Sequence, residues 1–176
     1  MSGLSLKTIP IGLTSLDTLD ADVLVLSPFG DERPLRGSAG FCDWRLNGRL
    51  SRLVQAGWFK SQPREVLLMD TCRRIGTRWI LLFGQGLRNG MTLDLFQQNL
   101  QRTANTLKKA RFLNFAIELP GVDPGPLSVP QAVSAFLDIF ATDLKQAKVT
   151  LLSPYQRFIE MVDEIAGEDE RISIIK

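Results

Sequence analysis

Histidine is absent from this chain of 176 residues. Histidine is the commonest general base near neutral pH and the commonest protein ligand for metals. Its absence excludes Ser-His-Asp and Cys-His nucleophilic systems within the chain, and it excludes histidine-containing zinc sites. Mechanisms based on carboxylates or lysine stay open. We predict no catalytic residue, no metal site and no cofactor.

Cysteine and long hydrophobic runs are scarce. The two cysteines, Cys42 and Cys72, form no Cys-x-x-Cys pair, and we expect both to be reduced thiols in a cytoplasmic protein. The densest apolar run, residues 79–83, is far shorter than the roughly 18 residues that a membrane span needs. The N-terminus has no basic segment followed by an apolar core, so it predicts no secretory signal.

The length and composition predict a single globular domain spanning residues 1–176, with 44% hydrophobic and 23% charged residues. The net charge is only +2, but it is unevenly distributed. Residues 33–88 carry eleven Lys or Arg and three acidic residues, so the rest of the chain carries a net charge of −6. A basic segment beside an acidic C-terminus indicates either an anionic partner or ion pairing within the fold.

Apolar patterns predict strands that alternate with helices. Short apolar runs, typical of strands covered on both faces, occur at 23–26, 65–69 and 79–83. A strand is also expected at 148–152. Three further strands are expected at 4–13, 113–119 (exposed on one face) and 172–175. Helices are expected around Leu46–Val54, at 92–110, from Ser128, and from Ser153 to near Gly167. Together they predict a three-layer α/β/α domain with a mixed, mainly parallel sheet.

The order of these blocks resembles the N-terminal, macro-domain-like domain of the leucyl aminopeptidases. The resemblance covers residues 20–121, and its most specific part runs from Asp43 to Val54, followed by the Gly57-Trp-Phe turn. It implies a domain without catalysis of its own, because the chain has nothing like the clustered Asp, Glu and Lys that hold two metal ions in that family's catalytic half. In that family the N-terminal domain contributes mainly to assembly and to access to the active site.

The resemblance also implies a ligand site. Macro domains bind ADP-ribose with two loops at the carboxyl ends of strands, and residues 27–40 and 120–125 match those loops. Both loops precede helices, whose N-termini present free N–H groups to anions. Here Ser27-Pro-Phe replaces the family's asparagine-rich element, and Pro124 and Pro126 remove two N–H donors. The implied ligand-binding residues are Asp22, Gly30, Gly37, Gly40, Gly121 and Gly125.

An alternative for these glycines and prolines is a role in ordinary turns. A second candidate surface consists of Arg45, Arg49 and Arg52, whose spacing predicts one shared helix face. Such a face can contact the phosphates of a nucleic acid, can be simply solvated, or can pair with the acidic segment 168–170. Three aromatic residues are predicted to lie in the core or to pack helices rather than to form a ligand box: Trp44, Trp58 and Phe59.

Three hypotheses about function remain open. The first is a non-catalytic binding or interaction module, with a phosphate-containing ligand such as a nucleotide or ADP-ribose, or with a second copy or an aminopeptidase as partner. The second is the N-terminal assembly or regulatory part of a metal-dependent cytosolic aminopeptidase. The third is nucleic-acid binding through the arginine-rich segment. No membrane partner is expected.

Overall fold

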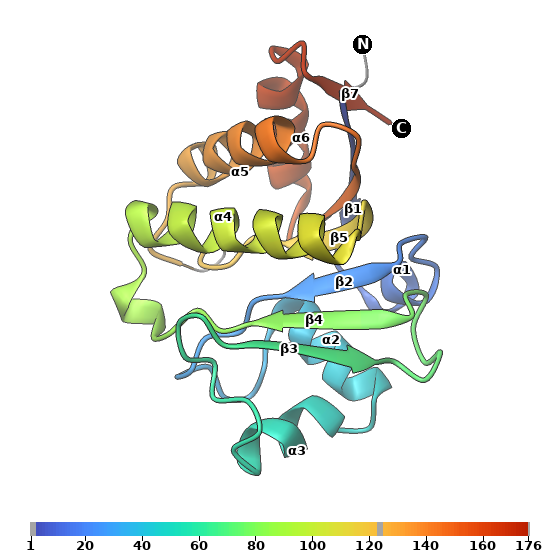
Figure 1. The fold of residues 1–176 in the computed structure, drawn as a ribbon, viewed down its shortest axis with the longest axis vertical. Coiled ribbons are helices and arrows are strands. Elements are labelled where there is room, and N and C mark those ends of the chain that lie inside the picture. Colours follow the sequence, from blue (N-terminus) through green and yellow to red (C-terminus); the bar gives the residue numbers. More distant parts are fainter. Residues whose placement is uncertain (1–2, 123–124, 176) are drawn as a thin grey trace.

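The computed structural model describes residues 3–122 and 125–175 (Figure 1). Within these residues seven strands form one sheet, in the order β3-β4-β2-β5-β6-β1-β7. The strands are β1 (Leu4–Pro10), β2 (Val23–Leu26), β3 (Val66–Asp70), β4 (Trp79–Phe83), β5 (Asn114–Glu118), β6 (Lys148–Ser153) and β7 (Ile172–Ile174). The helices are α1 (Leu13–Asp17), α2 (Gly37–Arg45), α3 (Arg49–Gln55), the 3₁₀ turn η1 (Arg88–Gly90), α4 (Leu93–Ala110), α5 (Val129–Asp143) and α6 (Gln156–Gly167).

The helices form two layers, one on each face of the sheet (Figure 1). Helices α4, α5 and α6 share one hydrophobic core with Val23, Val25 and alternating residues of the other central strands. Helices α1, α2 and α3 share a second core, in which Leu24 and Leu26 of the same β2 strand take part. Successive side chains of a strand point to opposite faces of the sheet, and helices cover both faces here. All four residues of β2 are therefore apolar and buried. The predicted three-layer architecture is confirmed.

The sheet is mixed, as predicted. Strand β3 runs antiparallel to β4, whereas the neighbouring pairs from β4 to β7 are all parallel. Val25 pairs with Ile117, so β2 and β5 lie side by side and end at the same edge of the sheet. Ligands of open parallel sheets bind outside the carboxyl ends of the strands, which makes this edge the place to look for a site.

The strand predicted at 65–69 was expected to be buried, and that prediction is wrong. Val66 and Leu68 of β3 are 45% and 47% exposed, because β3 is the last strand at one edge of the sheet.

Three further predictions about elements are wrong. The helix predicted around Leu46–Val54 is interrupted, because Asn47 and Gly48 adopt positive φ values of 53° and 73° and separate α2 from α3. Helix α2 also begins at Gly37, inside the segment predicted as a loop. Strand β5 was expected to expose one face, yet Phe115, Ala116 and Ile117 are all buried. The small Ala116 faces the second helical layer, so the alternation there reflects side-chain size rather than exposure.

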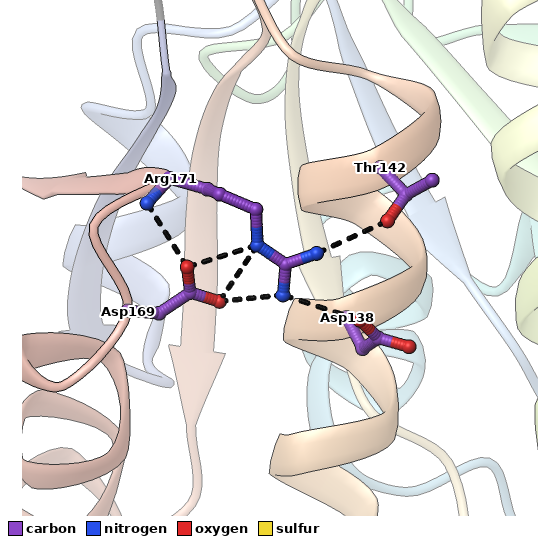
Figure 2. Close-up of polar contacts among 4 residues, drawn as sticks. All are labelled: Asp138, Thr142, Asp169 and Arg171. Carbon is purple, nitrogen blue, oxygen red and sulfur yellow. Dashed lines mark hydrogen bonds and ion pairs between the residues drawn. The ribbon is translucent and has the colours of Figure 1, made fainter.

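The C-terminal segment is fastened to α5 through Arg171 (Figure 2). Its Nε donates to Asp169 Oδ1 at 2.9 Å, its Nη2 donates to Asp138 Oδ1 at 3.1 Å, and its Nη1 donates to Thr142 Oγ1 at 3.2 Å. The carbonyl oxygen of Arg171 also accepts a hydrogen bond from Leu4 N at 2.9 Å, at the start of β1. These contacts position β7 beside β1 at the edge of the sheet.

Candidate functional site

A groove lies at the carboxyl ends of β2 and β5. It is lined by the segment that follows β2, by the first turn of α2, by the end of β5 and by Arg88 of η1. Its cavity volume is about 50 Å³. Pockets for small organic ligands usually measure about 300–1,000 Å³, so this groove is far smaller than a nucleotide site. The lining residues that carry charge are Glu32, Arg36, Arg88 and Glu118.

The Glu118 carboxylate lies against the N-terminus of α2. Its Oε2 accepts a hydrogen bond from the backbone N–H of Ser38 at 2.7 Å. A Cβ atom on Gly37 would lie only 2.3 Å from Glu118 Oε1, so the carboxylate fits there because residue 37 has no side chain. The first turn of α2 contains no acidic residue, and residue 36 gives no side-chain cap. Glu118 therefore supplies, from another element, the negative charge that a helix N-terminus favours.

Two of the other charged groups of the groove, Arg88 and Glu32, are paired with each other. Arg88 Nη2 lies 2.5 Å from Glu32 Oε1, and the Arg88 guanidinium lies 4.9 Å from the centre of the Phe29 ring. The backbone N–H of Arg88 donates to Asp31 Oδ1 at 2.9 Å. The groove therefore combines two carboxylates with two guanidinium groups and has no strong excess of positive charge.

Cys42, on the inner face of α2, is fully buried. Burial raises the pKa of its thiol above the usual range, and the nearby negative charges of Glu118 and Asp43 raise it further. Cys42 therefore stays protonated at neutral pH and cannot act as a nucleophile.

The predicted ligand-binding residues do not gather at one place. Of the six, Gly37 and Gly121 line the groove. Asp22 directly precedes β2, at the amino end of the strand, so it lies at the opposite edge of the sheet from the groove. Asp22 therefore begins a strand, as predicted, but it does not line this groove, and its role in ligand binding stays a prediction.

The remaining glycines allow segments of backbone to approach each other. A Cβ on Gly40 would lie 2.6 Å from the Leu35 carbonyl oxygen, and a Cβ on Gly125 would lie 1.9 Å from the Gly121 carbonyl oxygen. Gly30 N donates to the carbonyl oxygen of Gly86 at 2.7 Å. These contacts favour the turn interpretation for Gly30, Gly40 and Gly125. Pro124, which was expected to remove a donor from the second loop, lies outside the described residues.

The sequence prediction missed the charged residues of the groove: Glu32, Arg36, Arg88 and Glu118. One signal was available for Glu118, because it is an acidic residue at the last position of an otherwise apolar strand, directly before Leu119 and Pro120. Its partner at the start of α2 could not be recognised, since that helix begins inside a segment rich in glycine and proline.

The three arginines of the second candidate surface already have partners within the chain. Arg45 forms an ion pair with Asp17, with Arg45 Nε 2.8 Å from Asp17 Oδ1. Arg49 Nη1 donates to the Asp70 carbonyl oxygen at 3.1 Å, and Arg52 Nη1 donates to the Asn47 carbonyl oxygen at 2.6 Å. Since Arg45 belongs to α2 whereas the other two belong to α3, the prediction of one shared helix face is wrong.

Helix α2 also carries an aromatic surface. Phe41 is 38% exposed and Trp44 is 64% exposed, and both line an apolar groove of about 430 Å³ together with Leu13 and Leu35. We call these four residues the aromatic flank. Trp58, beyond the end of α3, is 75% exposed and does not line this groove. Trp44, Trp58 and Phe59 were predicted to lie in the core or to pack helices. Phe59 is fully buried, as predicted, whereas Trp44 and Trp58 are largely exposed and do not lie in the core.

Residues 3–122 and 125–175 contain neither a cluster of metal ligands nor a helix suited to cross a membrane. No three side chains among the Cys, Asp and Glu of this part gather closely enough to hold a metal ion. No helix of this part combines the length and the hydropathy that a membrane crossing needs.

The fold is that of a macrodomain. Similar solved structures include the macrodomain of Mycobacterium tuberculosis DarG, with a TM-score of 0.66, 17% identity, and coverage of 85% of this chain and 98% of that chain. The Oceanobacillus iheyensis macrodomain with ADP has a TM-score of 0.65 and 14% identity, over 90% of this chain and 88% of that chain. A variant of tomato leucine aminopeptidase has a TM-score of 0.61 and 14% identity, over 92% of this chain and 35% of that one.

The sequence comparison identifies the family. Residues 23–138 match the model of the cytosol aminopeptidase family, N-terminal domain, so the chain belongs to that family. A probable cytosol aminopeptidase from a Cyanothece strain is 26% identical over 118 residues, which are 67% of this chain. Another from Thermosynechococcus vestitus is 27% identical over 119 residues. The chain spans about a quarter of the length of these relatives, 24% and 23%.

Proposed function

We propose that this chain is a non-catalytic interaction module that binds a protein partner through the aromatic flank of α2. The observation that carries the proposal is Trp44, a large aromatic side chain that is 64% exposed beside an apolar groove. Contiguous apolar surface of this kind is costly to leave in water and marks binding sites. Tryptophan is also the residue type most enriched among those that dominate binding energy at interfaces.

The partner that we propose is an aminopeptidase-type catalytic part, in the same chain or in a separate one. The argument is the extent of the match, because about three quarters of each relative lies outside the segment that this chain covers. A domain that accompanies a catalytic part in its relatives needs a surface that contacts it. The names of those relatives also support the proposal that the protein works in the cytosol.

The test mixes this chain with a full-length cytosol aminopeptidase from the same cells and measures the mass and affinity of the complex by light scattering and calorimetry. We expect Trp44→Ala to weaken binding by about 30-fold or more, the size of a typical hot-spot loss of 2 kcal/mol. Trp58→Ala is the matched control, an exposed tryptophan outside the flank, and should leave the affinity unchanged. No complex with the unaltered chain, or equal affinity for both variants, would contradict the proposal.

A second candidate function is the binding of a phosphate-containing nucleotide in the groove at the ends of β2 and β5. It is favoured by the fold relative that holds ADP and by the two arginines that line the groove here. The volume of about 50 Å³ weighs against it. A thermal melt with ADP or ADP-ribose tests it, since a ligand at a hundred times its Kd adds about 2.7 kcal/mol of stability. We expect no shift.

Nucleic-acid binding through Arg45, Arg49 and Arg52 stays the third hypothesis. All three guanidinium groups already donate hydrogen bonds within the chain, which supports at most weak binding. We expect duplex DNA to bind only at low salt and without sequence preference, because phosphate contacts carry little sequence information. Tight binding at physiological salt that is lost on replacement of the three arginines would favour this hypothesis instead.

A further inference from the structure

We infer that Glu118 determines what the groove at the ends of β2 and β5 accepts: its carboxylate occupies the anion-binding end of α2 and excludes phosphate from this chain. The inference concerns the groove of the second candidate function. It does not depend on the partner proposed for the aromatic flank, so either can fail without the other.

The first step is the geometry at the helix N-terminus. A helix of nine residues such as α2 ends in N–H groups that have no partner inside the helix. Glu118 Oε2 takes the Ser38 N–H at 2.7 Å, and Oε1 lies where a Cβ of residue 37 would otherwise stand. An oxygen of a phosphate bound to this N–H would need the position that Glu118 Oε2 already holds.

The second step is charge. A phosphate in this groove would lie within a few ångströms of Glu118 and close to Glu32, which also lines it. Two unit charges of the same sign 4 Å apart repel each other by about 4 kcal/mol at the effective dielectric constant of 20 that suits protein surfaces. The opposing charge is limited, because Arg88, one of the two arginines of the lining, is already paired with Glu32.

The third step is space. The Glu118 side chain forms part of the lining of a cavity of about 50 Å³, so it takes up space that a phosphate at the Ser38 N–H would need. Shortening this side chain would remove the competing oxygen, remove one negative charge and enlarge the groove. Gly37, with its φ of +54°, would then leave the backbone N–H groups of α2 open to an anion from outside.

The experiment titrates inorganic phosphate, and separately ADP-ribose, into the unaltered chain and into Glu118→Ala, with the Ser38 amide followed by NMR. We expect no saturable shift for the unaltered chain and at least about tenfold tighter phosphate binding for Glu118→Ala, with the Ser38 amide among the resonances that move. Glu65→Ala is the matched control. The Glu65 carboxylate also accepts backbone N–H groups, those of Lys60 and Gln62 at 2.9 and 3.0 Å, but it does not line the groove.

A second variant covers the case in which Glu118→Ala fails to fold. Glu118→Gln keeps an oxygen for Ser38 but removes the charge, so it should also bind phosphate more tightly than the unaltered chain, though less tightly than Glu118→Ala. Saturable phosphate binding at Ser38 in the unaltered chain would overturn the inference. So would folded Glu118 variants that bind no better than the Glu65 control.

Discussion

The N-terminal turn of helix α2 and the outer side of the same helix differ in what they contact. At its N-terminal turn, the Ser38 N–H donates to the carboxylate of Glu118 from the central strand β5. Its outer side presents Phe41 and Trp44 to solvent beside an apolar groove. The difference shows that side chains from other elements decide which parts of one helix are satisfied within the chain and which stay exposed to solvent.

The physical basis of the difference is the cost of leaving each group unsatisfied. Free N–H groups at a buried helix end need a partner, and a carboxylate supplied by the chain meets that need permanently. Exposed aromatic carbon needs burial, which only another surface can supply. The N-terminal turn therefore has a charged partner within the isolated chain, whereas the outer side of the helix stays exposed to solvent.

The largest difference is expected in thiol reactivity. Cys42 lies on the inner side of α2, fully buried and with its pKa raised by burial, whereas Cys72 is exposed. A thiol reagent should therefore label Cys72 quickly and Cys42 more slowly, by on the order of a hundredfold or more, since Cys42 reacts only through unfolding or local opening. The measurement is the time course of labelling with and without denaturant. Two equally fast thiols in the native protein would break the comparison.

The next largest effect concerns Gly37→Ala. A Cβ there meets the Glu118 carboxylate at 2.3 Å on a backbone with a φ of +54°. We expect a loss of about 2–4 kcal/mol in the free energy of unfolding, from the strained backbone and the lost charge-assisted hydrogen bond to Ser38.

In a Glu118→Ala background the same glycine change should cost only the backbone strain, about 1–2 kcal/mol. The difference between the two backgrounds measures the coupling between Gly37 and Glu118. Urea denaturation of the four proteins in the cycle gives these values. Equal costs in both backgrounds would show that the carboxylate does not hold the helix end.

A smaller effect is expected from Asp169→Asn at the other end of the sheet (Figure 2). The side-chain hydrogen bond from Arg171 lowers the pKa of the Asp169 carboxyl below its usual value. Its contribution to stability is therefore complete above the unfolded pKa of about 3.9 and is lost as the pH falls through the lower folded value.

Because this pair is exposed to solvent, its replacement should cost about 0–1 kcal/mol at pH 7 and close to nothing well below pH 3. Thermal melts at the two pH values check this. A cost that is unchanged in acid would mean that the ion pair is not its source. The comparison with Glu118 then shows how much more a carboxylate contributes at a helix end than at the surface.

The smallest effect on stability is expected for Trp44→Ala. The side chain is 64% exposed, so its removal should change the free energy of unfolding by no more than about 0.5 kcal/mol, as for other surface changes. The same variant is expected to bind the proposed partner much more weakly, so its affinity should fall while its stability is kept. A large loss of stability in urea would place Trp44 in the packing of the isolated chain instead.

Much of the fold could be predicted from the sequence. The strands at 23–26 and 79–83 begin and end at the predicted residues, since a short apolar run between turn residues has few other arrangements. The break between α2 and α3 could not be predicted. It depends on Asn47 and Gly48 adopting positive φ values, and the apolar spacing of Leu46, Leu50 and Leu53 continues across it.

The candidate site was predicted only in part. Gly37 and Gly121, from the two loops predicted at the carboxyl ends of strands, do line the groove, whereas their binding of a ligand stays a prediction. Asp22 begins β2 as predicted but lies at the other end of the strand from the groove, a separation that only the position of the groove reveals. The exposed Trp44 and Trp58 contradict the general tendency of tryptophan to be mostly buried, a tendency that says nothing about the two sides of a particular helix.

By itself the sequence determined the class of fold, the absence of histidine chemistry and the segments that form strands, because these follow from composition and from periodicity within a few residues. Tertiary structure alone decided that Glu118 meets Ser38, 80 positions away in the chain, and that Trp44 faces solvent. Both outcomes depend on how β5 and α2 pack across the sheet edge. A contact between residues so distant in sequence leaves no local pattern from which it could be predicted.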